Sequence, residues 1–284
     1  RTHDRHGVGS SCRLRDAGCV TPLPDAWETV MILHAYRFRS VLYSTLAAAL
    51  LAPGAFAASA SLAERIATEA RSEEDRARDA DRRPAEVLAF LGLEEGMDVV
   101  DVMAASGWYT EVLSFAVGPA GTVAAQNPDF MLAFRDGAND KALAARLEGD
   151  RLPNVRRLDR NFDELDPAEG TYDVALSALN FHDVYNSAGR DAAVAMLEAV
   201  KSVLEPGGIF GIVDHVGVPE ADNAALHRIE KAKVVDAARA AGFEIVGESD
   251  VLASAEDDHT QGVFAEGLRG NTDRFVLKLR KPAA

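Results

Sequence analysis

Residues 97–107 read MDVVDVMAASG, and residues 108–117 follow at once with WYTEVLSFAV. The first stretch is a short apolar run with one acid, Asp101, inside it, and it ends in small residues and Gly107. The second stretch places its apolar side chains at helical spacing. A buried strand, a turn that contains glycine and an amphipathic helix therefore follow one another, which is typical of the opening unit of an α/β fold.

The same alternation continues along the chain. A helix is expected from Pro84 to about Gly92, before the first strand. The other strands are expected at 122–125, 154–158, 172–178, 209–213, 243–247 and 275–280, and the other helices at 129–147 (loosened at Gly137), 190–204 and 223–241. Strands that alternate with helices form a mainly parallel sheet. The last strand alternates apolar and polar residues after a long connection, so we expect it to be antiparallel and half exposed.

The composition limits the classes of function. The chain has 284 residues, 48% of them apolar and 26% charged, with 30 Lys and Arg against 45 Asp and Glu and a formal charge of −15. This ordinary globular composition excludes a collagen, a coiled coil and wholesale disorder. An acidic chain with only 7% aromatic residues lacks the cationic and stacking groups that bind nucleic acids. We therefore expect no nucleic-acid partner.

The first 57 residues are not expected to belong to the fold. Residues 1–30 show no helical or strand period, and we interpret them as a stray extension. Residues 31–57 have the three parts of a secretory signal peptide: a basic part, an apolar run at 41–51 and small residues that end at Ala57. We predict cleavage there and export to the periplasm; the alternative is a buried helix of the fold. The apolar run is too short to span a bilayer, so no stable membrane insertion is expected after cleavage.

The rest of the chain divides at Pro84. Residues 58–83 are polar and highly charged, and we expect them to form a solvated helical lead-in. Residues 84–284 are expected to form one domain, because no internal repeat or second unit is seen. Cys12 and Cys19 would be lost with the signal peptide, so we expect no disulfide, thiol nucleophile or cysteine metal ligand in the mature protein.

Several motifs resemble those of class I S-adenosylmethionine-dependent methyltransferases. The run from Val99 to Gly107 stands where that family has an acid followed by alternating glycines, and Met103 and Ala105 replace two of those glycines. The sequence LEPGG at 204–208 is similar to the Leu-x-Pro-Gly-Gly before the fifth strand of the family. The resemblance covers about residues 84–280 and is closest to a group of exported bacterial predicted methyltransferases, with further matches at Gln126-Asn127, Phe181-His182-Asp183, Val213-Asp214-His215 and RGNTDRF at 269–275.

The resemblance implies the fold, the cofactor and the place of the site. The fold would be a single-domain, Rossmann-like, doubly wound sheet of seven mostly parallel strands with an antiparallel last strand. S-adenosyl-L-methionine would bind at the carboxyl ends of the strands, where the strand order reverses. The residues that match the cofactor site are Asp101, Ala105, Gly107, Asn127, Asp163 and Asn180.

Several of these matches have a structural alternative. Asp101 would accept a bond from the ligand ammonium, or it would bond the local backbone. Gly107 is needed for the turn in either case, and it would also let the backbone approach the ligand closely. Asn127 stands where many methyltransferases have an acid for the ribose hydroxyls, and it would bond a hydroxyl without charge. Asp163 would contact the adenine amine or cap a turn.

The catalytic candidates are His182, Asp183 and His215. His182 and Asp183 follow the fourth strand, where the methyl acceptor lies in this fold. A histidine is suited to general-base work near neutral pH, so we predict His182 as the base, oriented by Asp183. His215 ends the fifth strand and would be a second base or an orienting group. The structural alternative is that His182 bonds the backbone while Asp183 caps the segment.

A metal site is the other chemistry that these residues allow. Two histidines and a carboxylate suit a transition metal. The four residues that have this composition are His182, Asp183, Asp214 and His215. Their spacing is long-range and does not indicate that they converge, so we predict no metal site. His227 and His259 have weaker cases.

The sequence favours transfer of the sulfonium methyl of S-adenosyl-L-methionine to a small-molecule acceptor, with positioning as the main source of acceleration. The alternative is a non-catalytic periplasmic protein that binds a small molecule with the same fold, because S-adenosylmethionine is made in the cytosol. A nicotinamide-dependent oxidoreductase is disfavoured, because Gly-x-Gly-x-x-Gly is absent and no acid closes the second strand. The acceptor and the oligomeric state stay open.

Overall fold

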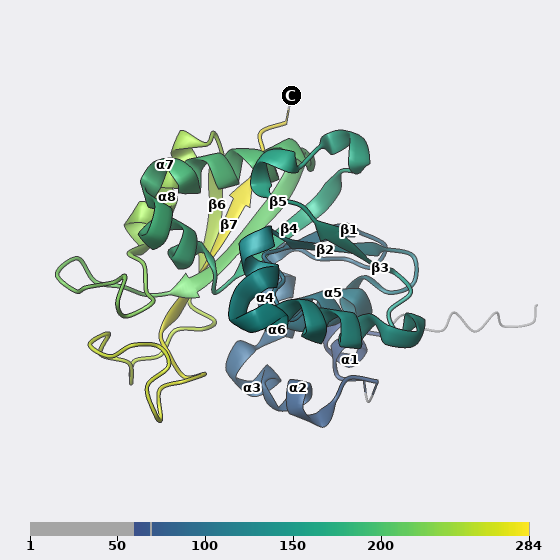
Figure 1. Ribbon diagram of the computed structural model, residues 1–284, viewed down its shortest axis with the longest axis horizontal. Coiled ribbons are helices and arrows are strands. Elements are labelled where there is room, and N and C mark those ends of the chain that lie inside the picture. Colours follow the sequence, from purple (N-terminus) through teal and green to yellow (C-terminus); the bar gives the residue numbers. More distant parts are fainter. Residues whose placement is uncertain (1–59, 69, 284) are drawn as a thin grey trace, which may run out of the picture. The chain divides into compact units, whose positions relative to one another are not determined.

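The computed structural model describes residues 60–68 and 70–283 of the chain. The predicted extension at 1–30 and the predicted signal peptide at 31–57 lie outside the described residues. The described residues belong to one compact unit, which is a seven-stranded sheet with helices on both faces (Figure 1). No helix in this described part is long and apolar enough to cross a membrane.

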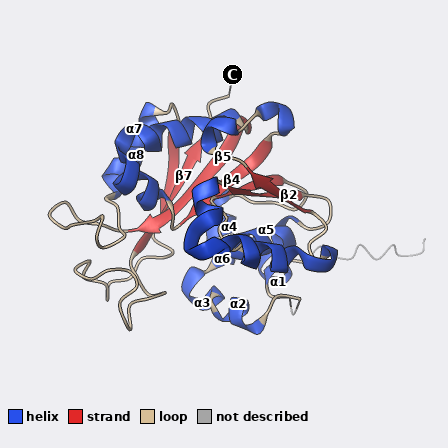
Figure 2. Cartoon of the chain, viewed as in Figure 1, coloured by secondary structure: helices blue, strands red, loops and turns tan. Residues whose placement is uncertain are grey.

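The sheet has the strand order β3-β2-β1-β4-β5-β7-β6. Its strands are β1 (Asp98–Val102), β2 (Thr122–Asn127), β3 (Val155–Asp159), β4 (Tyr172–Ala178), β5 (Leu204–His215), β6 (Glu244–Ser249) and β7 (Arg274–Arg280). Neighbouring strands are parallel except where β7 pairs with β5 and β6. The order reverses between β1 and β4. The predicted doubly wound α/β class with an antiparallel last strand is therefore confirmed (Figure 2).

The helices cover the sheet in two groups (Figure 1). On one face, α4 and α5 form a core with β1 and β2 that includes Leu88 and Leu113. On the other face, α7 and α8 bury side chains such as Leu197 and Val234. The helices are α1 (Leu62–Ile66), α2 (Glu73–Ala77), α3 (Asp79–Arg82), α4 (Pro84–Leu91), α5 (Trp108–Val117), α6 (Asp129–Leu147), α7 (Phe181–Ser202) and α8 (Lys231–Ala240), with short 3-10 turns η1 (Glu148–Asp150), η2 (Phe162–Glu164) and η3 (Pro167–Glu169).

Four elements differ from the sequence-based expectation. Helix α7 begins at Phe181, whose ring is fully buried. Gly189, near the predicted start, interrupts the helix without ending it. Strand β5 begins at Leu204, since a bulge lets LEPGG join the pairing with β4. Helix α8 begins at Lys231, after a longer loop than expected. Strand β7 is mostly buried rather than half exposed, because Phe275, Leu277 and Leu279 pack in the core of one face and Val276 packs in the core of the other.

The lead-in at 61–83 packs against the domain through a few buried side chains, although most of its residues are exposed or half-buried. Ile66 is 3% exposed and Arg71 is 1% exposed. The Arg71 guanidinium donates to both carboxylate oxygens of Asp79, at 2.7 and 2.9 Å. The guanidinium of Arg82 lies 4.6 Å from the ring centroid of Trp108, which is a cation–π contact. These contacts hold the arginines of the lead-in over the start of α5.

Candidate functional site

The carboxyl ends of β1, β4 and β5 lie side by side, because these parallel strands are neighbours in the sheet. The segments that follow them carry predicted site residues: Ala105 after β1, Asn180 and His182 after β4, and His215 at the end of β5. In open α/β sheets, ligands bind outside these ends where the order reverses. The topology therefore brings residues that are distant in sequence to one edge of the sheet.

The loop between β1 and α5 keeps a glycine-type backbone without most of the glycines. Met103, Ala105 and Gly107 have φ values of 55°, 51° and 81°. Residues with a Cβ rarely adopt positive φ, and each such residue costs roughly 1–2 kcal/mol. Met103 and Ala105 therefore adopt the left-handed backbone that favours glycine, although both carry side chains. The side chain of Met103 packs in the hydrophobic core.

Three amide side chains hold this loop. Gln126 Oε1 accepts a hydrogen bond from the backbone N–H of Met103 at 3.0 Å, and Asn127 Oδ1 accepts one from the N–H of Ala105 at 2.8 Å. Asn180 Nδ2 donates to the carbonyl oxygen of Met103, also at 3.0 Å. Gln126 and Asn127 are fully buried. These bonds to the loop backbone help to offset the strain of its positive φ angles.

Gly107 is required by packing as well as by its backbone conformation. A Cβ at this position would lie 2.7 Å from Leu143 Cδ1 and 3.2 Å from Arg146 Cδ, both on α6. Leu143 is fully buried. The left-handed backbone and the close approach of helix α6 therefore each require glycine here, whether or not a ligand also approaches.

Asp101 is a buried carboxyl at the end of β1, where it is 2% exposed. Thr110 Oγ1 donates to Asp101 Oδ2 at 2.6 Å. Burial raises the pKa of Asp101 to about 7, although the hydrogen bonds from Thr110 and the charge of Arg82 oppose the shift. The carboxyl therefore titrates near neutral pH.

Asp163 makes none of these contacts to the β1–α5 loop. It is an exposed residue of η2, after β3. The cap of that turn is made by Asn161 and Glu164. The side chain of Glu164 accepts a hydrogen bond from the backbone N–H of Asn161. The turn-capping role considered for Asp163 therefore belongs to its neighbours.

His182 lies in the first turn of α7 and is 3% exposed. Its Nδ1 is 2.7 Å from Asp214 Oδ1, and its backbone N–H donates to Asp214 Oδ2 at 2.8 Å. Its Nε2 is 3.2 Å from Asp183 Oδ1. The early start of α7 therefore buries the predicted base, His182, between two carboxylates.

The two imidazoles at these strand ends have opposite pKa shifts, although their ring centroids are only 5.8 Å apart. Burial alone would lower the pKa of His182, but Asp214 and Asp183 outweigh burial and raise this pKa to about 10. Burial lowers the pKa of His215 to about 3, and the charge of His182 adds to that shift. His182 is therefore the cationic partner at neutral pH and His215 the neutral one.

A cavity of about 680 Å³ opens beside His215. It is lined by Glu74, Arg78, Asp81, Arg82, Ser106, Leu179, His215, Val263, Phe264, Arg269, Gly270, Thr272 and Arg274. Four arginines face two acids, so the lining is cationic. His215 Nδ1 lies 2.8 Å from Thr272 Oγ1, which fixes the ring at the cavity wall. Among the predicted site residues, His215 is the one that lines this cavity.

Sequence reasoning missed Arg78 and Arg82 of this cavity and the placement of His227, whereas Arg269 and Arg274 belong to the matched segment RGNTDRF. Arg78 and Arg82 come from the lead-in, and a charged segment of this kind usually lies in solvent, so no local signal marks them. His227 Nδ1 lies 3.3 Å from Asp183 Oδ1. Its neighbour Arg228 is fully buried and donates to both oxygens of Asp257 at 2.9 Å. This ion pair anchors the loop that carries His227.

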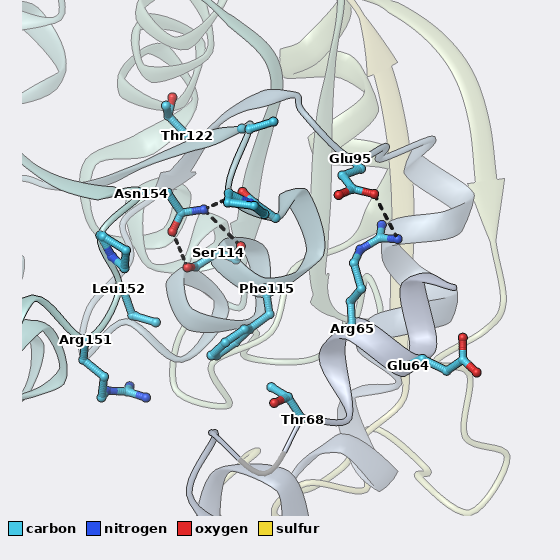
Figure 3. A pocket seen from close by; sticks show the side chains of 15 residues that line it. Glu64, Arg65, Thr68, Glu95, Ser114, Phe115, Thr122, Arg151, Leu152 and Asn154 are labelled. Carbon is cyan, nitrogen blue, oxygen red and sulfur yellow. Dashed lines mark hydrogen bonds and ion pairs between the residues drawn. The ribbon is translucent and has the colours of Figure 1, made fainter. Parts of the chain in front are cut away.

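A second cavity, of about 670 Å³, lies at the opposite edge of the sheet (Figure 3). It is lined by the last turn of α5, the start of β2 and residues of α1. Its polar contacts are internal: Ser114 Oγ donates to Asn154 Oδ1 at 2.6 Å, and Arg65 pairs with Glu95 at 3.9 Å. None of the predicted site residues lines it, so the site at the carboxyl ends of the strands is the better candidate.

Comparisons with known proteins agree with this topology. No protein-family model and no curated protein matches the sequence. An S-adenosylmethionine-dependent methyltransferase from Aquifex aeolicus is similar in structure, with 21% identity, a TM-score of 0.50, and coverage of 70% of this chain and 89% of that one. The 4+2 cyclase SpnF is also similar, with 18% identity, a TM-score of 0.52, and coverage of 77% and 86%. The chain therefore has the fold of class I S-adenosylmethionine-dependent methyltransferases.

Proposed function

We propose that the protein binds S-adenosyl-L-methionine at the carboxyl ends of β1 and β2 and transfers its methyl group to a small anionic acceptor. The observation that carries this proposal is the loop from Met103 to Gly107. Its three left-handed residues keep a costly backbone shape although two of them have side chains. Strain of this kind is concentrated at functional sites. Its position at the reversal of strand order supports a ligand site there.

The chain's own residues would share the work of holding the cofactor. When bound, S-adenosyl-L-methionine supplies an electrophilic methyl group on a sulfonium. Asp101, Ala105, Gly107 and Asp163 would line its site. Asn127 and Asn180 would act through the loop, because their amides already bond the backbone of Ala105 and Met103.

The acceptor's charge follows from the cavity. Arg82 makes no ion pair with another described residue, and burial together with Arg78 lowers its pKa to about 10. Arg274 uses its guanidinium on backbone carbonyls rather than on an acid. A carboxylate or phosphate group would therefore find uncompensated positive charge here.

An anionic acceptor also changes what the histidines need to do. A carboxylate or phosphate oxygen is already a nucleophile, so its attack requires no general base. An imidazolium at His182 has no lone pair to accept a proton, which argues against the base role predicted for it. His215 is neutral, and it is the residue of the two that would accept a proton from an acceptor that carries one. Asp183 would position His182.

Calorimetry of the full chain with S-adenosylhomocysteine tests the cofactor site. Ligand at 100-fold above Kd should stabilise the protein by about 2.7 kcal/mol and raise its melting temperature by several degrees. Ala105→Val should lose binding, because a β-branched residue does not adopt a φ near 51°. Ala105→Gly is the matched variant and should bind. Absence of binding at millimolar ligand would instead support a binding protein for another small molecule.

We also propose that the protein is exported. The support is the order of basic, apolar and small residues at 31–57. Mass spectrometry of the protein from the native envelope fraction should find a chain that begins near Ala58. An intact N-terminus in the cytosolic fraction would contradict export, and it would remove the problem of cofactor supply.

A further inference from the structure

We propose that His182, Asp183 and His227 form a binding site for a divalent transition-metal ion, next to the cationic cavity. The three residues come from the first turn of α7 and from the loop before α8. One ligand atom from each of them lies within 4.8 Å of the others. The site stands independently of the proposed methyl transfer, because none of its residues belongs to the β1–α5 loop.

The distances fit neighbouring ligands of one ion. Asp183 Oδ1 lies 3.2 Å from His182 Nε2 and 3.3 Å from His227 Nδ1. Metal–ligand bonds of about 2.0–2.1 Å place adjacent ligand atoms about 2.8–3.0 Å apart in octahedral geometry and about 3.3–3.4 Å apart in tetrahedral geometry. The carboxylate oxygen is therefore at coordination spacing from both imidazole nitrogens.

A second carboxylate orients His182 for this role. Asp214 is fully buried and lies 2.7 Å from His182 Nδ1, while it also accepts from the backbone N–H of His182. Binding of an ion would displace the proton from His182 Nε2. With Nδ1 still donating to Asp214, the freed Nε2 lone pair would face Asp183 Oδ1, which lies 3.2 Å away. Ligating histidines usually have such a carboxylate on their other nitrogen, because it fixes the ring and strengthens the ligand.

His227 is held in place rather than left on a free loop. Its φ is 55°, which is a strained value for a residue with a side chain. The buried pair of Arg228 with Asp257 fixes the next residue, and the N–H of Arg228 donates to the carbonyl of Asn223 at 2.9 Å. The side chains of Asp183 and His227 are 46% and 44% exposed, so an ion has a path from solvent.

The donor set defines the class of ion and its surroundings. Two imidazoles and one carboxylate favour Zn²⁺, Fe²⁺ or Co²⁺ over Mg²⁺ and Ca²⁺, and three protein ligands leave open positions. The ring of His227 lies 5.1 Å from that of Phe264, and Phe264 lines the cationic cavity. An open position would therefore lie near a bound anion, whose oxygen could complete the coordination.

Titration of the chelator-treated full chain with Co²⁺ tests the site, because the visible absorption of Co²⁺ reports its ligands. The variants are His227→Ala and Asp183→Asn. The matched control is His259→Ala, since His259 Nε2 pairs with Asp273 at 2.9 Å without a second imidazole. Histidines and cysteines of the first 57 residues are the same in every variant, so differences between variants report on this site.

We expect wild type and His259→Ala to bind one Co²⁺ per chain that His227→Ala and Asp183→Asn do not bind, or bind with an affinity at least 10-fold lower. The absorption bands of this Co²⁺ should disappear when Zn²⁺ displaces it. Equal stoichiometry in wild type and both site variants would overturn the proposal. Circular dichroism on each variant confirms that it is folded, and Asp183→Asn preserves shape if His227→Ala does not fold. Binding of S-adenosylhomocysteine by the same samples is measured separately, so a failed metal site and a failed cofactor site give different results.

Discussion

The two halves of the candidate site are held by different forces. The β1–α5 loop is held by neutral amides, since Gln126, Asn127 and Asn180 bond its backbone. The ends of β4 and β5 are held by charge, since His182 lies between Asp214 and Asp183. The first half should therefore respond to changes in side-chain volume and backbone shape. The second half should respond to removal of a charged partner.

The largest effect is expected at the charged half. Asp214→Ala should lower the free energy of unfolding by about 3–5 kcal/mol, because it leaves a buried imidazolium and two backbone N–H groups without their acceptor. Chemical denaturation measures this loss. Asp191→Ala, on the exposed side of α7, is the control and should leave the midpoint unchanged. Equal effects of the two variants would mean that Asp214 does not hold this half.

The neutral half should lose stability when its packing is disturbed. Gly107→Ala should cost about 2–4 kcal/mol, from a strained φ and from the contact with Leu143. Gly137→Ala is the matched control, because Gly137 has a φ of +77° but no atom closer than 3.9 Å to the added Cβ. It should cost only the conformational part, roughly 1–2 kcal/mol. If both variants lose the same stability, the approach of α6 does not matter.

The pH dependence of stability should report on Asp101, a buried carboxyl in β1 next to the neutral half. The unfolded Asp101 loses its proton near pH 3.9, whereas the folded one keeps it until about pH 7. The folded state binds more protons between these values, so Asp101 should make stability fall as pH rises through this window, by up to about 1.4 kcal/mol per pH unit. Asp101→Asn should remove this contribution. An unchanged pH profile in the variant would contradict the raised pKa.

The smallest effect on stability is expected for Arg82→Gln, whose main effect should be on the binding of anions in the cavity. Arg82→Gln keeps a polar side chain but removes a charge from the cavity. We therefore expect the affinity for inorganic phosphate or a small dicarboxylate to fall about 10-fold. Arg83→Gln is the control, because Arg83 pairs with Glu86 outside the cavity. Thermal-shift titration measures both. A loss of S-adenosylhomocysteine binding in Arg82→Gln would assign the arginine to the cofactor instead.

Local pattern was enough for many elements of the fold. The helix predicted at 108–117 and the strand predicted at 172–178 have the observed bounds, and the break near Gly137 lies inside α6. These features depend on residues that are close in sequence: the spacing of apolar side chains, and glycine where the chain turns. The motif after β1 also lies where the strand order reverses.

Tertiary structure alone decided the parts of the site that depend on distant residues. Strand β7 is buried although its alternation indicated exposure, because burial depends on what packs on each face of the sheet, and both faces are covered here. Arg82 reached the cavity because α3 packs on Trp108, and His227 reached Asp183 because the pair of Arg228 with Asp257 anchors its loop. The charge of His182 likewise comes from Asp214, which is 32 residues away in sequence and 2.7 Å away in space. Sequence determines which residues are present and which helix or strand carries them, whereas pKa values and ligand sets depend on distances that only the packed chain defines.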